Sequence, residues 1–352
     1  MAYPSNRYQR QHQVTQLGGQ ARSKLAKAHV LIVGAGGLGS PVSLYLAGAG
    51  VGEISLIDSD IVSLSNLHRQ ILYQENDIST SKVDAACNRL RSLNSEITVN
   101  SINAQLSTNN VAQLVSGVDV VVDAADNFIT TYLLSDVCSE TKIPLVSASV
   151  LGTHGYLGVF CGSLLSPDSQ VDLTEGDNKQ CVAPSYRAVF PSPPAQADNC
   201  NSAGVTGPSV GIIGSYQAQE VLKVIVGDPS QLIGRLMYLD LWSYQQKIID
   251  FNGAPEPSNK AEIVDIATLD DNDVLLDVRN ESEVQRNPTS RSHSAGNVIN
   301  LPLAQLRDQA KELLLADTRI VCVCKSGQRA LSAAYWLINN GYKNVAVSIQ
   351  SI

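Results

Sequence analysis

The stretch HVLIVGAGGLGSPVSLYLAGAG, residues 29–50, decides the fold. Its first five residues form an apolar run that predicts a buried strand, and the apolar spacing after the glycines predicts a helix. The run EISLID, residues 53–58, follows as a second strand. A strand, a glycine-rich turn, a helix and a strand in this order form the opening unit of a parallel α/β sheet.

Later apolar runs extend the same pattern. Residues 118–122 and 144–150 predict two further strands, with a helix over residues 82–93 between earlier strands. A helix over 210–225 and the strand-like run LMYLDL, residues 236–241, follow. We therefore predict a Rossmann-like, mostly parallel sheet with helices on both faces.

A second α/β unit follows the first. The stretch FNGAPEPSNKA, residues 251–261, combines Pro, Gly, Asn and Ser and has little to bury, which predicts a linker. Beyond it come the strand-like runs VLLDV from residue 274 and IVCVC from residue 320, then a helix over 329–339. The predicted division is a first domain over 1–250, a linker over 251–261 and a small domain over 262–352.

The composition is that of a soluble globular protein, with 44% hydrophobic and 16% charged residues in a chain of 352. A net charge of -8 argues against a broad binding surface for nucleic acid or anionic lipid, which needs clustered Lys and Arg. The N-terminal stretch is polar, and no apolar run approaches the ~20 residues of a membrane span. Seven scattered cysteines do not resemble a secreted disulfide framework, so we expect a cytoplasmic protein.

The glycine-rich turn has the spacing of a nucleotide site. Gly34, Gly36 and Gly39 form G-x-G-x-x-G between a strand and a helix, and Asp58 ends the next strand. Glycine lets backbone N–H groups approach a phosphate at the helix N-terminus, while the carboxylate accepts hydrogen bonds from ribose hydroxyls. The fingerprint alone predicts only a bound nucleotide, and tight strand-to-helix packing without a ligand is the alternative.

A polar and cationic cluster follows Asp58. It favours an enzyme that uses ATP over one that transfers hydride with a nicotinamide cofactor. Asn66, Arg69 and Gln70 lie in SNLHRQ just past the second strand, and Lys82 follows in STSKVD. Nucleophilic attack on an α-phosphate develops negative charge that preorganised donors must meet, whereas a nicotinamide enzyme needs no such cluster. The alternative is that Arg69 and Lys82 are solvated surface cations.

Together these motifs resemble the MoeB/ThiF family of the ubiquitin-activating superfamily. The resemblance covers about residues 7–250 and rests on RYQRQ, GAGGLGS, SNLHRQ, AADN and CNSAGVTGPSVGIIGSYQAQEVLK. It implies a homodimer that uses ATP and Mg²⁺ to adenylate the C-terminal Gly-Gly carboxylate of a ubiquitin-like sulfur-carrier protein. No general base is required, because that carboxylate is already ionised at neutral pH.

The resemblance also implies residue roles. Asp126 in the AADN turn would carry Mg²⁺, and Arg10 would reach across the homodimer interface to the partner's nucleotide. Each role has an alternative without a ligand. Asp126 with Asn127 could cap a helix, and Arg10 could simply be exposed to solvent. Asp58 would hold the ribose, and Asn66, Arg69 and Lys82 would contact the phosphates. The implied nucleotide contacts are Gly34, Gly36, Gly37, Gly39, Asp58, Asn66, Arg69, Gln70, Lys82 and Asp126.

Cysteine placement both matches the family and departs from it. Cys200, at the end of a long polar loop over residues 162–201, matches the cysteine that can attack the activated carrier; a buried, unreactive thiol is the alternative. The family commonly holds a structural zinc with two Cys-x-x-Cys pairs. Here Ser185 and Ala188 stand at the first pair, and the segment over 240–253 has no cysteine. We therefore predict no structural zinc, because four thiolates are needed.

From about residue 261 the chain resembles a single rhodanese domain, in LLDVRNESEV, SHSAGNVINLPL and VCVCKSGQRALSAAYWLINNGYKNVAV. Cys324 begins a C-K-S-G-Q-R loop between a strand and a helix, where successive backbone N–H groups stabilise a thiolate or persulfide. Cys322, in the strand, is expected in the core. The chain ends at VSIQSI where family members continue with a Gly-Gly turn and a helix, so we expect a trimmed domain.

The predicted activity is carrier adenylation followed by sulfur transfer from a persulfide on Cys324, with Cys200 as the relay. A persulfide sulfur donor would load Cys324. Two alternatives stay open: a non-catalytic scaffold that binds a carrier, and an NAD-dependent oxidoreductase, which only the glycine fingerprint favours. The sequence does not choose among molybdopterin, thiamine, tRNA-thiolation and natural-product pathways.

Overall fold

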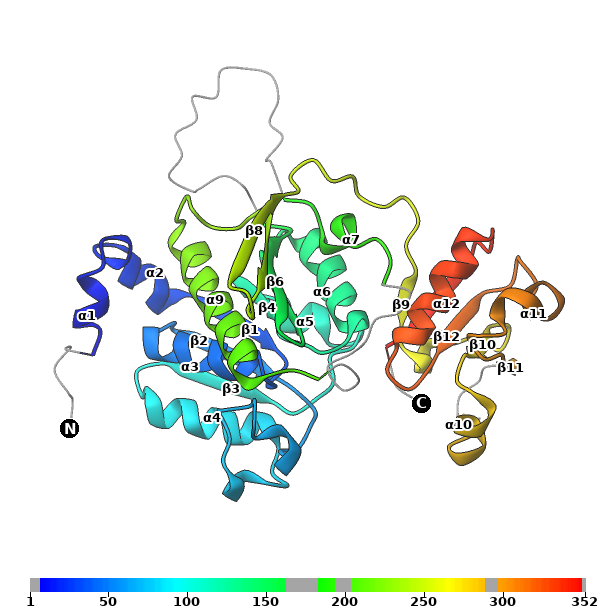
Figure 1. Cartoon of the computed structure of the whole chain (residues 1–352), viewed down its shortest axis with the longest axis horizontal. Helices are drawn as coiled ribbons and strands as arrows, with labels where there is room; N and C mark the ends of the chain where they lie inside the picture. The colour runs from blue at the N-terminus through cyan, green and yellow to red at the C-terminus, as the bar shows by residue number, and fades with distance from the viewer. Residues whose placement is uncertain (1–6, 163–182, 194–203, 289–296, 350–352) are drawn as a thin grey trace, which may run out of the picture.

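Two sheets organise the chain in the computed structural model, which describes residues 7–162, 183–193, 204–288 and 297–349. One sheet has eight strands in the order β3-β2-β1-β4-β5-β6-β7-β8, and the other has five in the order β11-β10-β12-β13-β9. Figure 1 shows the larger unit beside the smaller, C-terminal unit. The predicted α/β class with a second small α/β unit is confirmed.

The large sheet is parallel in its first part and antiparallel in its second. Strands β3, β2, β1, β4 and β5 pair in parallel, and β6, β7 and β8 continue as antiparallel neighbours. The strands are β1 (His29–Val33), β2 (Glu53–Ile57), β3 (Thr98–Ile102), β4 (Val120–Asp123), β5 (Leu145–Leu151), β6 (His154–Phe160), β7 (Arg235–Asp240) and β8 (Gln245–Asp250).

Helices cover both faces of this sheet, because two separate apolar clusters form on its two sides. One cluster joins the sheet to α3 (Gly39–Ala49), α4 (Lys82–Leu93) and α9 (Gly207–Val226). The other joins it to α5 (Val111–Val115) and α6 (Phe128–Thr141). Further helices are α1 (Gln9–His12), α2 (Ala21–Lys27) and α7 (Tyr186–Val189).

The small sheet is parallel throughout. Its strands are β9 (Glu262–Val264), β10 (Val274–Asp277), β11 (Asn297–Asn300), β12 (Ile320–Val323) and β13 (Val345–Ser348). Its helices are α10 (Glu281–Arg286), α11 (Leu306–Leu313) and α12 (Gln328–Asn339). Cys322 in β12 is fully buried, as expected. Asp277, the last residue of β10, forms a buried ion pair with Arg279, with Oδ2 and Nη2 2.7 Å apart.

The segment over residues 251–261 packs more closely than its composition predicts. It forms no helix or strand, but Phe251 is buried and its ring stacks on Phe160 with centroids 4.9 Å apart. The Glu256 carboxylate accepts hydrogen bonds from the backbone N–H and the hydroxyl of Ser185, at 2.7 and 2.6 Å. These partners lie far away in the sequence, so composition alone gives no sign of them.

We predict that Gly39→Ala destabilises the protein strongly, whereas Gly48→Ala on the same helix does not. A Cβ on Gly39 would lie 2.0 Å from the Gly34 carbonyl oxygen, so backbone would have to move, at a cost of about 1–3 kcal/mol or more. A Cβ on Gly48 meets nothing within 4 Å. Alanine there should stabilise the helix by about 0.5–1 kcal/mol. Thermal unfolding midpoints measure both, and equal midpoints for the two variants would contradict the prediction.

Candidate functional site

The glycine-rich turn closes against β4 and α9, where side chains would not fit. Gly34 has a φ of +100°, and a Cβ on it would lie 2.6 Å from the Ala124 carbonyl oxygen. A Cβ on Gly37 would lie 2.7 Å from Cγ1 of Val210, at the start of α9. The turn is therefore free of side chains at Gly34, Gly36, Gly37 and Gly39, past the carboxyl end of β1, and Gly36 and Gly37 are half-buried there. A phosphate-binding turn needs such close access to backbone N–H groups.

Asp58 follows β2 and holds this turn in place. Its Oδ2 accepts a hydrogen bond from the Ala35 backbone N–H at 2.8 Å, and its Oδ1 accepts one from the Asp60 N–H at 2.8 Å. A carboxylate has about four lone-pair sites, so further acceptor capacity remains for ribose hydroxyls.

Lys82 is buried at the first position of α4. Its Nζ lies 2.8 Å from Oδ2 of Asp60, with 6% of the Lys82 side chain and 68% of the Asp60 side chain exposed. The alternative that Lys82 is a solvated surface cation is therefore wrong. Arg69 is partly buried, and its Nη1 donates to the Ser65 carbonyl oxygen at 3.1 Å and to His68 Nε2 at 2.8 Å.

The Gln70 side chain carries an unused acceptor beside the turn. It is 4% exposed, and its Oε1 is buried with no hydrogen-bond partner among the described residues. A Cβ on Gly36 would come 3.7 Å from Gln70 Nε2, which places this amide next to the glycines. A buried, unpaired acceptor favours a ligand that donates to it. Asn66 lies half-buried in the same segment.

The AADN turn leads from β4 into α6 and exposes Asp126. The helix cap comes from Asn127, whose Oδ1 accepts from the Thr130 N–H at 2.9 Å, so the Asp126 carboxylate is not spent on capping. Mg²⁺ is commonly bound through one or two carboxylates together with substrate phosphates. A single exposed carboxylate at this turn fits that pattern.

Sequence reasoning missed Asp123, at the end of β4. Its Oδ2 accepts hydrogen bonds from the hydroxyls of Thr131 and Ser147, both at 2.8 Å, and burial raises its pKa to about 6. Gln217 of α9 donates to the Asp123 carbonyl oxygen at 2.8 Å. The sequence signal was an aspartate ending an otherwise apolar strand, which a buried hydrogen-bonded role explains.

Cys324 follows β12 in the C-K-S-G-Q-R loop and is 1% exposed. Its Sγ accepts a hydrogen bond from the Ala330 backbone N–H at 3.4 Å, in the first turn of α12. The Arg329 guanidinium donates to both carboxylate oxygens of Glu283, at 2.7 and 2.8 Å. Glu283 raises the pKa of Arg329, and Cys324 raises it further. The pKa of Glu283 falls to about 2.

The model of the ThiF family matches residues 8–261, well over half of the chain. The chain belongs to the ThiF family. A rhodanese-like domain model matches residues 265–352, so this ThiF-family chain carries a C-terminal rhodanese-like domain, as the motifs predicted.

Several curated proteins are similar to this chain in sequence. "Adenylyltransferase and sulfurtransferase MOCS3" of Culex quinquefasciatus is 44% identical over 236 residues, covering 66% of this chain and 50% of the relative. "Adenylyltransferase and sulfurtransferase uba4" of Aspergillus clavatus is 45% identical over 226 residues, covering 64% and 44%. The "SAMP-activating enzyme E1" of Haloferax volcanii is 35% identical over 253 residues, covering 71% and 87%. The chain spans about half the length of the MOCS3 and uba4 relatives.

Solved structures share the fold. Crystal structures of E. coli MccB, one with ATP and one with AMPCPP and MccA, match with TM-scores of 0.56 and 0.57 at 23% and 22% identity. Each match covers 73% of this chain and 74% of MccB. At this identity the likeness concerns the fold of the ThiF domain.

Arg10 and Cys200 are two of the residues that the family resemblance implies. No described contact joins either of them to the other candidate site residues. Arg10 is exposed in α1, at the edge of the molecule in Figure 1. Cys200 lies outside the described residues.

Ser185 and Ala188 lie at α7, where Ser185 caps the helix by accepting from the Ala188 N–H at 3.2 Å. Over the described ranges, no group of three or more His, Cys, Asp or Glu side chains could hold a metal ion. No helix in those same ranges is both long and apolar enough to cross a membrane.

We predict that Asp123→Asn changes how stability depends on pH. The pKa of Asp123 is raised from 3.8 to about 6, so the folded state binds its proton more tightly than the unfolded state. The free energy of unfolding of the native chain should therefore fall as pH rises from about 4 to about 6. Asparagine does not titrate. Between pH 4.5 and pH 7 the free energy of unfolding of the variant should therefore rise by about 2 kcal/mol relative to that of the native chain. Urea unfolding at both pH values measures this, and a constant difference would refute the assignment.

Proposed function

We propose that this chain uses ATP to adenylate the C-terminal Gly-Gly carboxylate of a ubiquitin-like sulfur-carrier protein, and then converts it to a thiocarboxylate. The observation that carries the proposal is the buried Lys82, whose partner Asp60 bonds to the same Asp58 that holds the glycine turn. Among the described residues the one carboxylate partner of Lys82 is Asp60, which is largely exposed, so the ammonium can exchange that partner for a phosphate. The names of the MOCS3, uba4 and SAMP-activating relatives support the same chemistry.

In the first step the carrier carboxylate attacks the α-phosphorus of ATP. A carboxylate–phosphorus bond forms, the bond to pyrophosphate breaks, and pyrophosphate leaves with the electron pair. Lys82 and Arg69 meet the negative charge that develops on the phosphate oxygens. Asp126 would hold Mg²⁺, which would neutralise phosphate charge. The turn glycines and Asp58 position the nucleotide, and Gln70 Oε1 accepts a hydrogen bond from it.

In the second step a persulfide on Cys324 attacks the acyl carbon. The new carbon–sulfur bond forms as the carbon–oxygen bond to AMP breaks, and AMP leaves with that electron pair. A thiolate then attacks the inner sulfur of Cys324, releasing the carrier thiocarboxylate and leaving a disulfide. We assign this thiolate to Cys200, and a low-molecular-weight thiol reduces the disulfide. A persulfide-bearing sulfur donor reloads Cys324. Arg329 and the amide of Ala330 stabilise the anionic sulfur.

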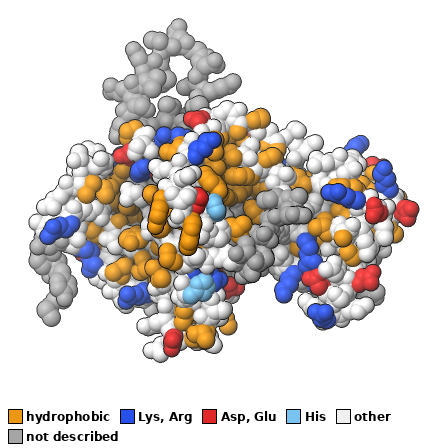
Figure 2. All heavy atoms as spheres, in the orientation of Figure 1, with side chains coloured by type: hydrophobic (Ala, Val, Ile, Leu, Met, Phe, Trp, Pro, Cys, Tyr) orange, Lys and Arg blue, Asp and Glu red, His pale blue; other side chains and the backbone are white. Residues whose placement is uncertain are grey.

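The assembly belongs to the same proposal. We propose a cytoplasmic homodimer in which Arg10 reaches the partner's nucleotide. Tyr238 of β7 and Ile249 of β8 are exposed apolar side chains on one face of the sheet, because Tyr238 pairs with Lys247 and Ile249 lies two residues further along β8. Figure 2 shows apolar side chains gathered in the middle of that view. Exposed apolar patches of this kind mark protein-binding surfaces, and we assign this one to the carrier's folded domain.

We predict that Lys82→Ala and Arg69→Ala each abolish carrier-dependent exchange of pyrophosphate into ATP, by more than about a hundredfold, because each removes a donor to the transition state. Arg89→Ala, which removes an exposed cation from the same helix as Lys82, is the matched control and should keep exchange. Radiolabel exchange with each candidate carrier measures the rates. Carrier binding with no adenylate would favour a non-catalytic scaffold, and saturable NAD binding without ATP binding would favour an oxidoreductase.

We also predict that Cys324→Ser keeps pyrophosphate exchange but stops thiocarboxylate formation. The serine hydroxyl cannot carry a persulfide, while the adenylation site is untouched. Mass spectrometry of the carrier separates adenylated from thiocarboxylated forms. Undiminished thiocarboxylate from this variant would show that sulfur does not come from the rhodanese-like domain.

A further inference from the structure

The rhodanese-like domain is docked on helix α6 of the ThiF domain. One apolar cluster runs through both domains and includes Ile129 and Leu133 of α6 with Leu331 and Ala334 of α12. Figure 1 shows the small domain against the side of the larger one that carries α5 and α6. An apolar interface of this kind opposes the relative motion that is usual between tethered domains.

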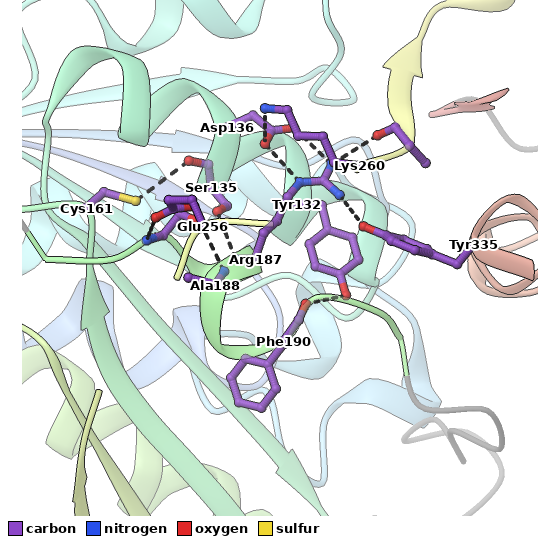
Figure 3. Close-up of polar contacts among 12 residues, drawn as sticks. Tyr132, Ser135, Asp136, Cys161, Arg187, Ala188, Phe190, Glu256, Lys260 and Tyr335 are labelled. Carbon is purple, nitrogen blue, oxygen red and sulfur yellow. Dashed lines mark hydrogen bonds and ion pairs between the residues drawn. The ribbon is translucent and has the colours of Figure 1, made fainter. Parts of the chain in front are cut away.

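A buried arginine joins the two domains within this interface. Arg187 of α7 is 1% exposed, and its Nε and Nη2 donate to the two carboxylate oxygens of Asp136 in α6, at 2.8 and 2.9 Å. Its Nη1 donates to the Tyr335 hydroxyl of α12 at 2.7 Å, and its Nη2 to the Ala261 carbonyl oxygen at 3.4 Å. The guanidinium also lies 4.4 Å from the centroid of the Tyr132 ring. Figure 3 shows these side chains converging on Arg187.

The partners of the Arg187 guanidinium lie on α6, on α12 and in the segment over 251–261. Because one guanidinium binds all of them, it fixes the positions of these three elements relative to one another. A buried guanidinium that loses a partner is left with an unpaired donor, which is costly. Asp136 also takes a second cation, Lys260, at 3.1 Å, and Glu256 holds α7 through Ser185. Arg187 therefore ties α6 and the segment over 251–261 to a helix of the rhodanese-like domain.

Helices α6 and α12 lie side by side in the same chain direction, with contacts at two levels. At the first level, a Cβ on Gly327 would come 2.1 Å from Cδ1 of Ile129. At the second level, Arg187 joins Asp136 to Tyr335. The two levels are about 10 Å apart along α6 and about 12 Å apart along α12, at 1.5 Å per residue. Fixing the second level therefore fixes where the start of α12 lies along α6.

The start of α12 is the Cys324 loop, and the start of α6 is the AADN turn. Gly327 lies three residues after Cys324, and Ile129 lies three residues after Asp126. The contact between Gly327 and Ile129 thus places the sulfur-bearing loop on the first turn of α6, beside the turn that carries Asp126. A persulfide extends the reactive sulfur by about 2 Å beyond Sγ.

We propose that Arg187 is a positioning residue for sulfur transfer, which keeps the Cys324 loop beside the adenylation site of its own chain. The inference rests on the proposed function. Arg187 touches no reacting atom: it acts through Tyr335 and Asp136 by holding α12 alongside α6. Sulfur then passes from the persulfide of Cys324 to the acyl-adenylate formed in the same chain.

The first test compares three rates in Arg187→Met and Tyr335→Phe of the full chain. The rates are pyrophosphate exchange, sulfur transfer from thiosulfate to cyanide, and thiocarboxylate formation on the carrier. Only the last should fall, through kcat, by about tenfold for Arg187→Met and about threefold for Tyr335→Phe, which removes one hydrogen bond. Arg319→Met is the control, because Arg319 pairs only with Glu262 and Asp273 of its own domain in the described contacts.

Several outcomes of that test would overturn the proposal. They are unchanged thiocarboxylate formation in Tyr335→Phe, or a fall in all three rates together, or an equal fall in Arg319→Met. Tyr335→Phe keeps the ring and its packing, so it tests the idea even where Arg187→Met fails to fold. A native chain that forms no adenylate at all would instead defeat the proposed function.

The second test asks whether transfer stays within one chain. Full-length Lys82→Ala, defective in adenylation, is mixed with full-length Cys324→Ser, defective in sulfur transfer, under conditions that allow subunit exchange. We expect no more thiocarboxylate from the mixture than from either variant alone, because no chain has both sites. Recovery of thiocarboxylate toward about a quarter or more of the native rate would show transfer between chains and overturn the proposal.

Discussion

The structure depends on a steric constraint at the glycine-rich turn. Gly39 packs on the Gly34 carbonyl group and Gly34 on the Ala124 carbonyl group, at separations that leave no room for a Cβ. This contact brings the ends of β1 and β4 together, and so sets where α6 begins. Ile129 of α6 packs against Gly327, which belongs to the Cys324 loop. The position of α6 therefore also affects the position of that loop. Backbone packing at one turn thus influences the surroundings of both candidate sites.

The exposure of the carboxylate partner distinguishes buried cations that hold the fold together from one that is available to a ligand. Arg187 and Arg279 are each paired with a carboxylate that is itself largely buried, so neither can leave its partner without cost. Lys82 differs, because its partner Asp60 is mostly exposed and water can solvate that carboxylate once the ion pair opens. A phosphate can therefore replace Asp60 at low cost, and the local charge is ready for an anionic ligand.

The sequence predicted the elements whose signals are local. Strands β1, β2, β4, β5 and β7 are apolar runs, and helices α3, α4 and α9 have helical apolar spacing, so each could be placed within a few residues. Strand β8 was missed because all its residues are exposed. Asp123, the packing of residues 251–261 and the Arg187 contacts were missed for a different reason: each is defined by partners distant in the sequence. The candidate nucleotide residues could be named from the sequence because their spacing around the first two strands is itself the signal, and their roles stay a prediction.

In the proposed function, helix α6 links the site of adenylation to the site of sulfur transfer. Its N-terminal turn follows Asp126 and supports the Cys324 loop, and its Asp136 anchors the arginine that joins the domains. A sulfur donor on a free tether would meet the acyl-adenylate only at the effective concentration that the tether allows. Under the proposed function, holding the Cys324 loop on a helix of the ThiF domain would remove most of that orientational search before a carrier binds. An acyl-adenylate is reactive towards water, so a donor already in place would favour the proposed sulfur transfer over hydrolysis.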